Sequence, residues 1–273
     1  MQEQVVLVTG ASSGIGAAIA QDLATQGGFY VFAAARRMDR LEQLRTKHIE
    51  PLYLDLTDHD SIQAAVTHIM ASKKRVDVLV NNAGYGLYGA VEGVIIEEAR
   101  HQFEVNVFGL GRMTQAILPI MRQQRSGRII NVSSVAGKVS TPMAGWYSAS
   151  KHAVEALSDA LRGEVQRFGI KVSVIEPGAI RTEFEEVALG ELSKTDEANV
   201  YRDMAAAFAK LVGNNYRRAP QADVVARAVR HAVTARHPRL RYALPMDSRT
   251  FIFLRGLLGD RLLDRMILSQ LRG

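Results

Sequence analysis

Cysteine is absent from the 273 residues of this sequence. The absence excludes a disulfide scaffold, a thiolate metal site and a cysteine nucleophile, and it fits a reducing compartment, most simply the cytoplasm. The seven histidines show no ligand-type spacing, so we expect no metal site.

Long apolar runs are also absent. No uncharged stretch is long enough to cross a bilayer, and the N-terminus MQEQVVLVTG lacks the basic segment, apolar run and cleavage site of a signal peptide. These absences favour a soluble protein.

The excess of positive charge is small and spread out. The formal net charge is +6, but the lysines and arginines form no dense basic run. This distribution argues against nucleic-acid binding, whereas an anionic small ligand needs far fewer positive charges. With 47% hydrophobic residues, the chain can bury a sizeable core, and its length fits one large α/β domain.

Short apolar runs alternate with longer helical patterns. The runs are nearly continuous in apolar residues, as in a sheet covered on both faces. They predict strands at residues 5–10, 30–35, 51–56, 76–84, 128–134, 171–178 and 239–245. Between them lie helical patterns such as 148–167, where Val154, Leu157 and Leu161 recur at spacings of three and four. This alternation predicts a doubly wound parallel sheet of the α/β class.

The alternation breaks after Pro177-Gly178. Residues 179–219 are polar and helical in character, and an alanine- and valine-rich helix follows at 221–235. No linker or internal repeat divides the chain. We therefore predict one domain, 1–273, with a helical lid insertion at about 183–219 and a C-terminal helical extension at about 246–273.

A glycine-rich turn, TGASSGIG at 9–16, follows the first predicted strand and opens a helix. Gly10, Gly14 and Gly16 allow a tight turn and close approach of the backbone to a ligand, with Ser12, Ser13 and Ile15 between them. A pyrophosphate would fit the N–H groups at the start of that helix. The spacing differs from the usual G-x-G-x-x-G pattern, so a purely structural turn is the alternative.

Two arginines follow the second predicted strand. An NAD-type site would place an acidic residue there to bind the ribose 2′-hydroxyl, but the sequence has Ala35 followed by Arg36 and Arg37. A guanidinium suits a 2′-phosphate, which favours NADP(H), with Arg36 as first candidate and Arg37 as second. A solvated pair at a helix start is the alternative.

Several motifs then occur in one order. They are TGASSGIG, Asp55, NNAG (81–84), Asn106, the pair Ser133-Ser134, YSASK (147–151) and PGAIRT (177–182). In order and spacing they resemble the short-chain dehydrogenase/reductase superfamily from about residue 4 to 182. The resemblance implies a Rossmann sheet of about seven parallel strands, a nicotinamide cofactor and a Ser-Tyr-Lys site supported by an asparagine.

The resemblance also assigns roles to individual residues. Ser134, thirteen residues before Tyr147, is the expected catalytic serine ahead of Ser133, and Asn106 is expected to hold a water in the proton relay. Further expected cofactor contacts, beside the glycine turn, Tyr147 and Lys151, are Asp55, Leu56, Asn81, Ala83, Gly84, Pro177, Gly178, Ile180 and Thr182.

Carbonyl reduction explains why these residue types occur together. A donor must protonate the developing alkoxide, and a tyrosine, whose free pKa is about 10, needs a nearby cation to bring it towards physiological pH. Tyr147 and Lys151 share a helix face, so Lys151 is expected to lower the pKa of Tyr147 and to hold the nicotinamide ribose. Ser134 would donate a hydrogen bond to the substrate oxygen.

The segments expected around the reacting carbonyl are apolar and aromatic, with Tyr85, Met143, Trp146 and Phe184 as candidate substrate contacts. They favour a lipophilic ketone, aldehyde or alcohol. With its long C-terminus, the chain is similar to the branch containing 17β-hydroxysteroid dehydrogenase, retinol dehydrogenase and acyl-dihydroxyacetone-phosphate reductase. The alternatives are a 3-oxoacyl-carrier-protein reductase and a non-catalytic NADP(H)-binding sensor.

The C-terminal helical pattern at 251–268 has two interpretations. Its apolar residues and arginines permit contact with a membrane surface, but the interleaved acids weaken attraction to anionic lipid. We therefore favour a helix that caps the substrate cleft or packs in an oligomer. The resemblance implies a homodimer or homotetramer through helices at about 97–124 and 147–167.

Overall fold

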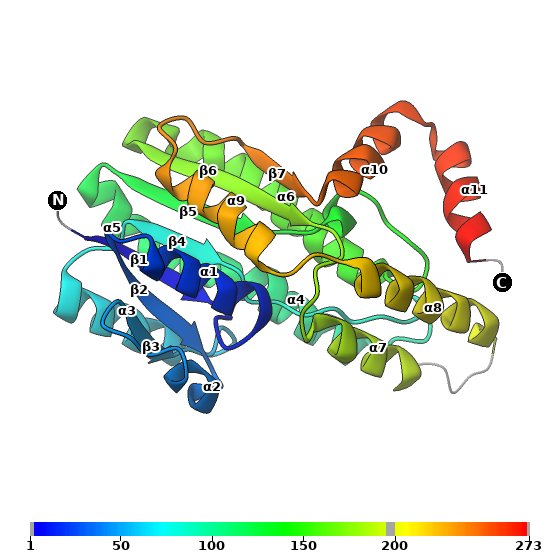
Figure 1. The fold of residues 1–273 in the computed structure, drawn as a ribbon, viewed down its shortest axis with the longest axis horizontal. Helices are drawn as coiled ribbons and strands as arrows, with labels where there is room; N and C mark the ends of the chain where they lie inside the picture. Colours follow the sequence, from blue (N-terminus) through cyan, green and yellow to red (C-terminus); the bar gives the residue numbers. More distant parts are fainter. Residues whose placement is uncertain (1–2, 195–199, 272–273) are drawn as a thin grey trace.

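A seven-stranded parallel sheet with helices on both faces forms the body of the computed structural model, which describes residues 3–194 and 200–271 (Figure 1). Its strand order is β3-β2-β1-β4-β5-β6-β7, which confirms the doubly wound parallel sheet predicted from the sequence. The strands are β1 (Gln4–Thr9), β2 (Phe29–Ala35), β3 (Ile49–Tyr53), β4 (Val78–Asn81), β5 (Gly127–Val132), β6 (Ile170–Pro177) and β7 (Arg241–Leu244).

The two faces of the sheet are buried in separate cores. Side chains of successive residues in a strand point to opposite faces. Val6 and Val8 of β1 accordingly pack with α1 (Gly14–Thr25) and α9 (Asp223–Thr234). Val5 and Leu7 pack on the other face with α3 (His59–Lys73), α5 (Leu110–Gln124) and the end of α6 (Gly145–Val165). Burial on both faces explains the continuous apolar runs of the strands.

Shorter helical elements lie between the strands and the longer helices. They are α2 (Met38–Glu42), α4 (Ile96–Phe103), a π-helical segment (Glu104–Gly109) that joins α4 to α5, and 3₁₀ turns at Val135–Gly137 and Gln166–Phe168. The fourth strand is shorter than the predicted run 76–84. It ends at Asn81 because the backbone N–H groups of Asn82 and Ala83 donate to the Thr9 hydroxyl instead of continuing a ladder.

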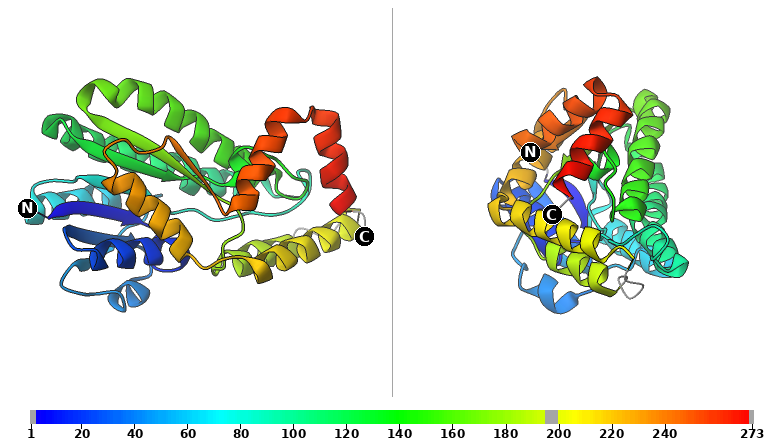
Figure 2. Two further views of the ribbon diagram at one scale, coloured as in Figure 1. Left: turned by 45° about the horizontal axis from the view of Figure 1, so that its top comes forward. Right: turned by 90° about the vertical axis from the view of Figure 1, so that its right-hand side faces the viewer.

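Four helices gather beyond the carboxyl ends of the strands (Figure 2). They are α7 (Phe184–Lys194) and α8 (Arg202–Arg218) from the predicted lid, and α10 (Met246–Leu257) and α11 (Asp260–Gln270) from the predicted extension. Residues 195–199 of the lid and 272–273 of the extension lie outside the described residues. Phe208 and Val212 of α8 share an apolar cluster with Leu263 and Ile267 of α11, so the two pairs of helices form one end of the molecule.

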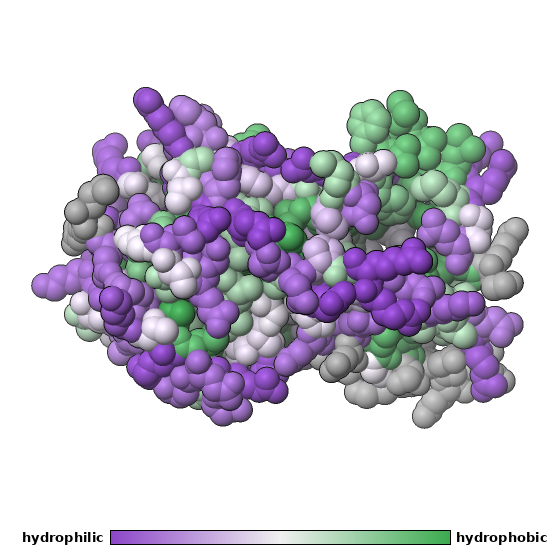
Figure 3. All heavy atoms as spheres, viewed as in Figure 1, coloured by the Kyte–Doolittle hydropathy of each residue, from purple (hydrophilic) through white to green (hydrophobic). Residues whose placement is uncertain are grey.

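The C-terminal helices also carry an exposed apolar face. Figure 3 shows it over α10 and α11, and Phe253, Leu257 and Leu262 are among its exposed residues. Among residues 3–194 and 200–271, no helix is long and apolar enough to cross a bilayer.

Candidate active site

A cavity of about 1360 Å³ opens at the carboxyl ends of the strands. Its wall includes the glycine turn after β1, the segments after β2, β3, β4 and β5, the start of α6, the segment after β6, and parts of α8, α10 and α11. A crevice at this edge, where the strand order reverses, is where open α/β sheets bind ligands. Most of the residues predicted from the sequence converge here.

The glycine turn is built for close approach. Gly10 and Gly14 have φ values of 67° and 54°, and a Cβ on Gly10 would lie 2.7 Å from the Ala83 Cα. Ser13, the N-cap residue of α1, makes no capping hydrogen bond through its side chain, so the first N–H groups of the helix remain available to an anion.

Not every glycine of the turn faces the cavity. Gly10, Ser12, Ser13, Gly14 and Ile15 line it. Gly16 does not line the cavity, and a Cβ on this residue would lie 2.3 Å from the carbonyl oxygen of Gly10. Gly16 is therefore needed for the packing of α1 against the turn, and its expected contact with the cofactor stays a prediction.

The end of β2 presents two arginines. Ala35 closes the strand, and Arg36 and Arg37 both line the cavity. The Arg37 guanidinium donates from Nε to the Ser12 Oγ at 3.2 Å and from Nη2 to the Ser13 Oγ at 2.8 Å. Arg37, ranked second from the sequence, is thus the arginine tied to the glycine turn.

Asp55 and Leu56 line the cavity after β3. Asp55 Oδ1 accepts hydrogen bonds from the backbone N–H and the hydroxyl of Thr57, at 2.9 and 2.8 Å. Burial acts to raise the pKa of Asp55, but the hydrogen bonds from Thr57 and the charge of Arg36 outweigh it and lower the pKa. A carboxylate therefore persists at this part of the wall.

Asn81 departs from its expected place. Its side chain is buried and donates to Thr114 Oγ1 and Asn131 Oδ1, so it is turned away from the cavity. Asn82 lines the cavity instead, together with Ala83 and Gly84, and its amide donates to the carbonyls of Thr9 and Gly10. The alternation of side chains along a strand explains why neighbouring residues face opposite ways.

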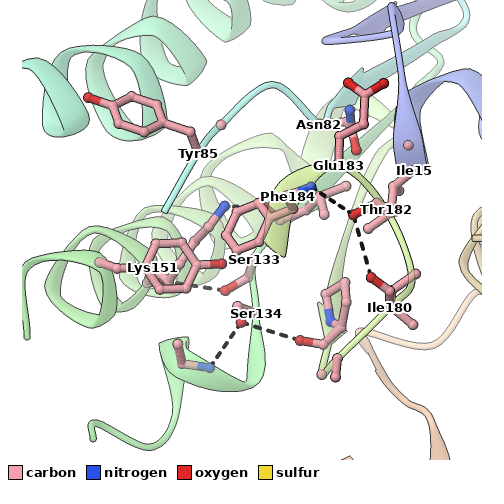
Figure 4. A pocket seen from close by; sticks show the side chains of 18 of the residues that line it. Ile15, Asn82, Tyr85, Ser133, Ser134, Lys151, Ile180, Thr182, Glu183 and Phe184 are labelled. Carbon is pink, nitrogen blue, oxygen red and sulfur yellow. Dashed lines mark hydrogen bonds between the residues drawn. The ribbon is translucent and has the colours of Figure 1, made fainter. Parts of the chain in front are cut away.

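Ser134, Tyr147 and Lys151 all belong to the cavity wall. Figure 4 shows Ser134 and Lys151 near each other in that wall. Tyr147 and Lys151 lie one turn apart near the start of α6, and Ser134 lies beside the Tyr147 phenol, whose pKa it acts to lower. The Ser134 hydroxyl also donates to the Pro177 carbonyl at 3.3 Å. The Lys151 ammonium lies 5.9 Å from the Tyr147 ring centroid and donates to the Val132 carbonyl at 3.0 Å. Hydroxyl, phenol and ammonium groups are therefore within reach of one bound molecule.

Burial controls the ionisation of Tyr147 and Lys151. It raises the pKa of Tyr147 to about 12, and the hydrogen bond with Ser134 opposes the shift only in part. It also lowers the pKa of Lys151 to about 8. The expected lowering of the Tyr147 pKa by Lys151 is therefore wrong for the coenzyme-free chain, because the rings of Tyr88 and Phe184 pack against the phenol. At neutral pH Tyr147 retains its proton and suits a proton donor.

Two of the other predicted polar residues have supporting positions. Asn106 lies in the π-helical segment, and its amide accepts from the backbone N–H of Tyr85 while donating to the Tyr85 carbonyl and the Ser150 hydroxyl. The Asn106 side chain thus connects the segment after β4 to α6, and it does not line the cavity. Ser133 is buried and its hydroxyl donates to the Lys151 carbonyl, which leaves Ser134 as the serine beside Tyr147.

The segment after β6 provides the remaining predicted cofactor contacts. Pro177, Gly178, Ile180 and Thr182 all line the cavity. A Cβ added to Gly14 would lie 3.1 Å from the Thr182 Cβ, so this segment closes over the glycine turn. The glycine turn and the segment that ends at Thr182 therefore form one continuous wall of the cavity.

The four predicted substrate contacts divide into two that line the cavity and two that do not. Tyr85 and Phe184 line the cavity, but Met143 and Trp146 do not. Trp146 faces Phe103 and donates to the Val91 carbonyl, because consecutive residues of a helix point about 100° apart and Tyr147 faces the cavity. Met143 is buried in the turn before α6.

An aromatic wall completes the cavity. Tyr88 belongs to the segment 85–88 that was expected around the reacting carbonyl, whereas Phe208 and Tyr216 of α8 and Phe251 of α10 were not named from the sequence. No local motif marks these residues, since α8 and α10 reach the cavity only through the tertiary fold. Phe251 of α10 and Gln270 of α11 also line the cavity, so the C-terminal extension contributes to its wall.

Comparisons with known proteins agree with this architecture. A family model described as short chain dehydrogenase matches residues 4–190. The NADPH-dependent 3-dehydrocapnine reductase of Ornithobacterium rhinotracheale is 36% identical over 275 residues, covering 97% of this chain and 96% of the relative. The 17-beta-hydroxysteroid dehydrogenase type 6 of Rattus norvegicus is 34% identical over 283 residues, covering 98% of this chain and 88% of the relative.

A solved structure supports the same placement. The crystal structure of a short-chain dehydrogenase/reductase from Burkholderia phymatum in complex with NAD matches with a TM-score of 0.82 at 26% identity, over 94% of each chain. The chain therefore belongs to the short-chain dehydrogenase/reductase superfamily of oxidoreductases.

Proposed function

We propose that this chain is an NADP(H)-dependent oxidoreductase that interconverts a lipophilic ketone or aldehyde and its alcohol. The observation that carries the proposal is the Ser134-Tyr147-Lys151 cluster, which shares one cavity with a glycine turn and two arginines. A proton donor and an anion-binding turn in one cleft suit hydride transfer between a dinucleotide and a carbonyl.

The residues of the cavity fit the coenzyme. The N–H groups at the start of α1 would hold the pyrophosphate, and Arg36 and Arg37 the 2′-phosphate. Asp55 and Leu56 would border the adenine, while Ala83, Gly84, Ile180 and Thr182 would border the nicotinamide half. When bound, the coenzyme supplies or accepts the hydride. The preference for NADP(H) is supported by Arg37 on the glycine turn and by the NADPH-dependent relative, although a structural neighbour holds NAD.

In the reducing direction, the residues of the cluster have separate roles. Ser134 would donate a hydrogen bond to the carbonyl oxygen and stabilise its developing charge. Tyr147 would transfer its hydroxyl proton to that oxygen as the C–H bond forms at carbon. Lys151 would then stabilise the phenolate, which regains a proton from solvent. Asn106 would act as a positioning residue, since it holds Tyr85 and α6 together.

The substrate class follows from the rest of the wall. Tyr88, Phe184, Phe208 and Phe251 bring aromatic rings to the part of the cavity beyond Tyr147. Such a wall suits an apolar substrate, with Ser134 and Tyr147 fixing its carbonyl. One relative is named for a hydroxysteroid. A lid action of residues 183–219, a homodimeric or homotetrameric state and a cytoplasmic location stay predictions.

The proposal is tested with the variant Tyr147→Phe in a screen of NADPH oxidation against lipophilic ketones and aldehydes. We expect turnover to fall by about a thousandfold or more while the Kd for NADPH changes less than about threefold, because only the transferred proton is removed. Tyr53→Phe, at an exposed tyrosine outside the cavity, is the matched control.

The same screen separates the alternatives. Near wild-type turnover in Tyr147→Phe would refute the role of this residue. Tight NADPH binding by the native chain without turnover of any carbonyl would favour a coenzyme sensor. Activity confined to acyl-carrier-protein thioesters would favour the 3-oxoacyl reductase.

A further inference from the structure

A carboxylate stands among the arginines of the cavity. Glu183 lies between Thr182 and the first residue of α7, and it lines the same cavity as Arg37 (Figure 4). Its Oε2 lies 3.4 Å from Arg37 Nη1, and its Oε1 lies 3.4 Å from Arg40 Nη1. One carboxylate therefore bridges two guanidinium groups at the edge of the site.

The bridged arginine is the one that the site offers to a phosphate. Arg37 is fixed to the glycine turn by its bonds to Ser12 and Ser13, so its remaining Nη1 edge is directed to Glu183. Carboxylates and phosphates are both anionic acceptors that match a guanidinium fork. In the coenzyme-free chain Glu183 therefore holds the edge of Arg37 that a 2′-phosphate would use.

We propose that Glu183 is a specificity-determining residue that competes with the coenzyme 2′-phosphate for Arg37; this rests on the proposed use of NADP(H). Binding of NADPH has to displace the carboxylate or bring a dianion beside it. Binding of NADH, which has only a 2′-hydroxyl, leaves both ion pairs in place. Glu183 therefore narrows the difference in affinity between the two coenzymes.

The competition is weak because the ion pairs of Glu183 with Arg37 and Arg40 are exposed to solvent. The side chains of Arg37 and Glu183 are 50% and 43% exposed, and ion pairs in such positions are weak and screened by salt. The carboxylate is thus expected to tune coenzyme affinity and to leave binding of NADP(H) intact.

The test is a direct titration of NADPH and NADH into the native chain and the Glu183→Gln variant by calorimetry at low ionic strength. Glutamine keeps the size of the side chain, which matters because Phe184 follows directly and packs on Tyr147. We expect the Kd for NADPH to fall about three- to fivefold in the variant and the Kd for NADH to change less than about twofold.

Glu42→Gln is the matched control, since Glu42 forms an exposed ion pair with Arg45 outside the cavity. Neither Kd should change in it. An unchanged Kd for NADPH in Glu183→Gln, or an equal gain for both coenzymes, would overturn the role of Glu183. A failure of the proposed preference for NADP(H) would give a different result. The native chain would then bind NADH as tightly as NADPH, whatever the Kd values of the variant.

Discussion

The ring of Phe184 lies against the ring of Tyr147, with centroids 5.7 Å apart and planes inclined by 54°. Tyr88 packs on the same phenol at 5.9 Å, edge to face. Together these rings contribute to the burial that dominates the pKa of Tyr147. The residue that covers the proton donor is the first residue of α7, so the segment predicted as a lid begins directly over the chemistry.

Removing the Phe184 ring should widen the site. In Phe184→Ala, we expect kcat/KM for a bulky ketone to rise at least about fivefold relative to a small one, because apolar pocket volume discriminates between substrates by about this amount or more. The measurement is NADPH oxidation with a homologous series of ketones. Phe253→Ala, at a ring that is 69% exposed on α10, is the control. An unchanged ratio would show that Phe184 does not limit access to Tyr147.

The pKa of Lys151 predicts how reduction depends on pH. Burial lowers this pKa to about 8, so Lys151 is charged below pH 8 and able to stabilise the phenolate that forms on Tyr147. Since the Tyr147 pKa is about 12, the phenol keeps its proton over the whole range. We expect kcat/KM for reduction to fall as the pH rises through about 8.

The profile has an internal check. Lys151→Arg replaces the ammonium with a group that stays charged in proteins, so the residual activity of this variant should show no fall between pH 7 and 10. A native profile that is flat up to pH 10 would contradict the role given to Lys151.

The fold was predictable because its signals are local. Most of the strands carry a nearly continuous apolar run, which fits two-sided burial of the sheet. The glycine turn and the pair Tyr147 and Lys151 were predictable for the same reason, since their geometry is set by spacing within one turn or one helix. Ser134 joins them because β5 and α6 meet at the same edge of the sheet.

Side-chain direction and distant contacts were harder to predict. Trp146 and Asn81 each neighbour a cavity residue in the sequence, yet both face away, because direction depends on where the helix or strand begins. Phe208 and Phe251 reach the cavity from separate helices, so only the tertiary fold brings them to Tyr147. The carboxylate of Glu183 was missed because its partners lie more than 140 residues away in the chain.

The packing of Gly16 predicts an asymmetry between two glycines. A Cβ at Gly16 would lie 2.3 Å from a backbone oxygen, which cannot move aside cheaply, whereas a Cβ at Gly163 in α6 meets no atom within 4 Å. We expect Gly16→Ala to destabilise the fold by about 1–3 kcal/mol and to weaken NADPH binding. Gly163→Ala should raise the free energy of unfolding by about 0.5–1 kcal/mol, because alanine is a better helix former than glycine.

Thermal unfolding with and without NADPH measures both effects. The destabilised variant should unfold several degrees lower, and the gain in Tm on adding NADPH should be smaller than in the native chain. If the two glycines respond alike, the close packing of α1 on the turn is not what requires Gly16.

A buried acidic pair behind the site predicts how stability depends on pH. Glu155 and Glu176 are both buried, and they share Lys138 and Arg241 as counter-ions at 2.7–3.7 Å. Burial, with the charge of Glu155, raises the pKa of Glu176 from its ordinary value of 4.5 to about 7. The folded chain therefore binds a proton at Glu176 more tightly than the unfolded chain does.

Proton linkage gives the direction in which stability changes with pH. A raised pKa contributes stability that is fully present below about pH 4.5 and is lost as the pH rises through about 7. Glu176→Gln removes this titration, so the stability of the native chain relative to the variant should decline between pH 5 and 8 by on the order of 2 kcal/mol. Urea unfolding at a series of pH values measures it. Glu42→Gln provides a control that should be flat over this window, because the hydrogen bond from Arg45 lowers the pKa of Glu42 from 4.5 and its titration lies below pH 5. A difference between the native chain and Glu176→Gln that is constant from pH 5 to 8 would show that Glu176 is ionised throughout in the folded protein.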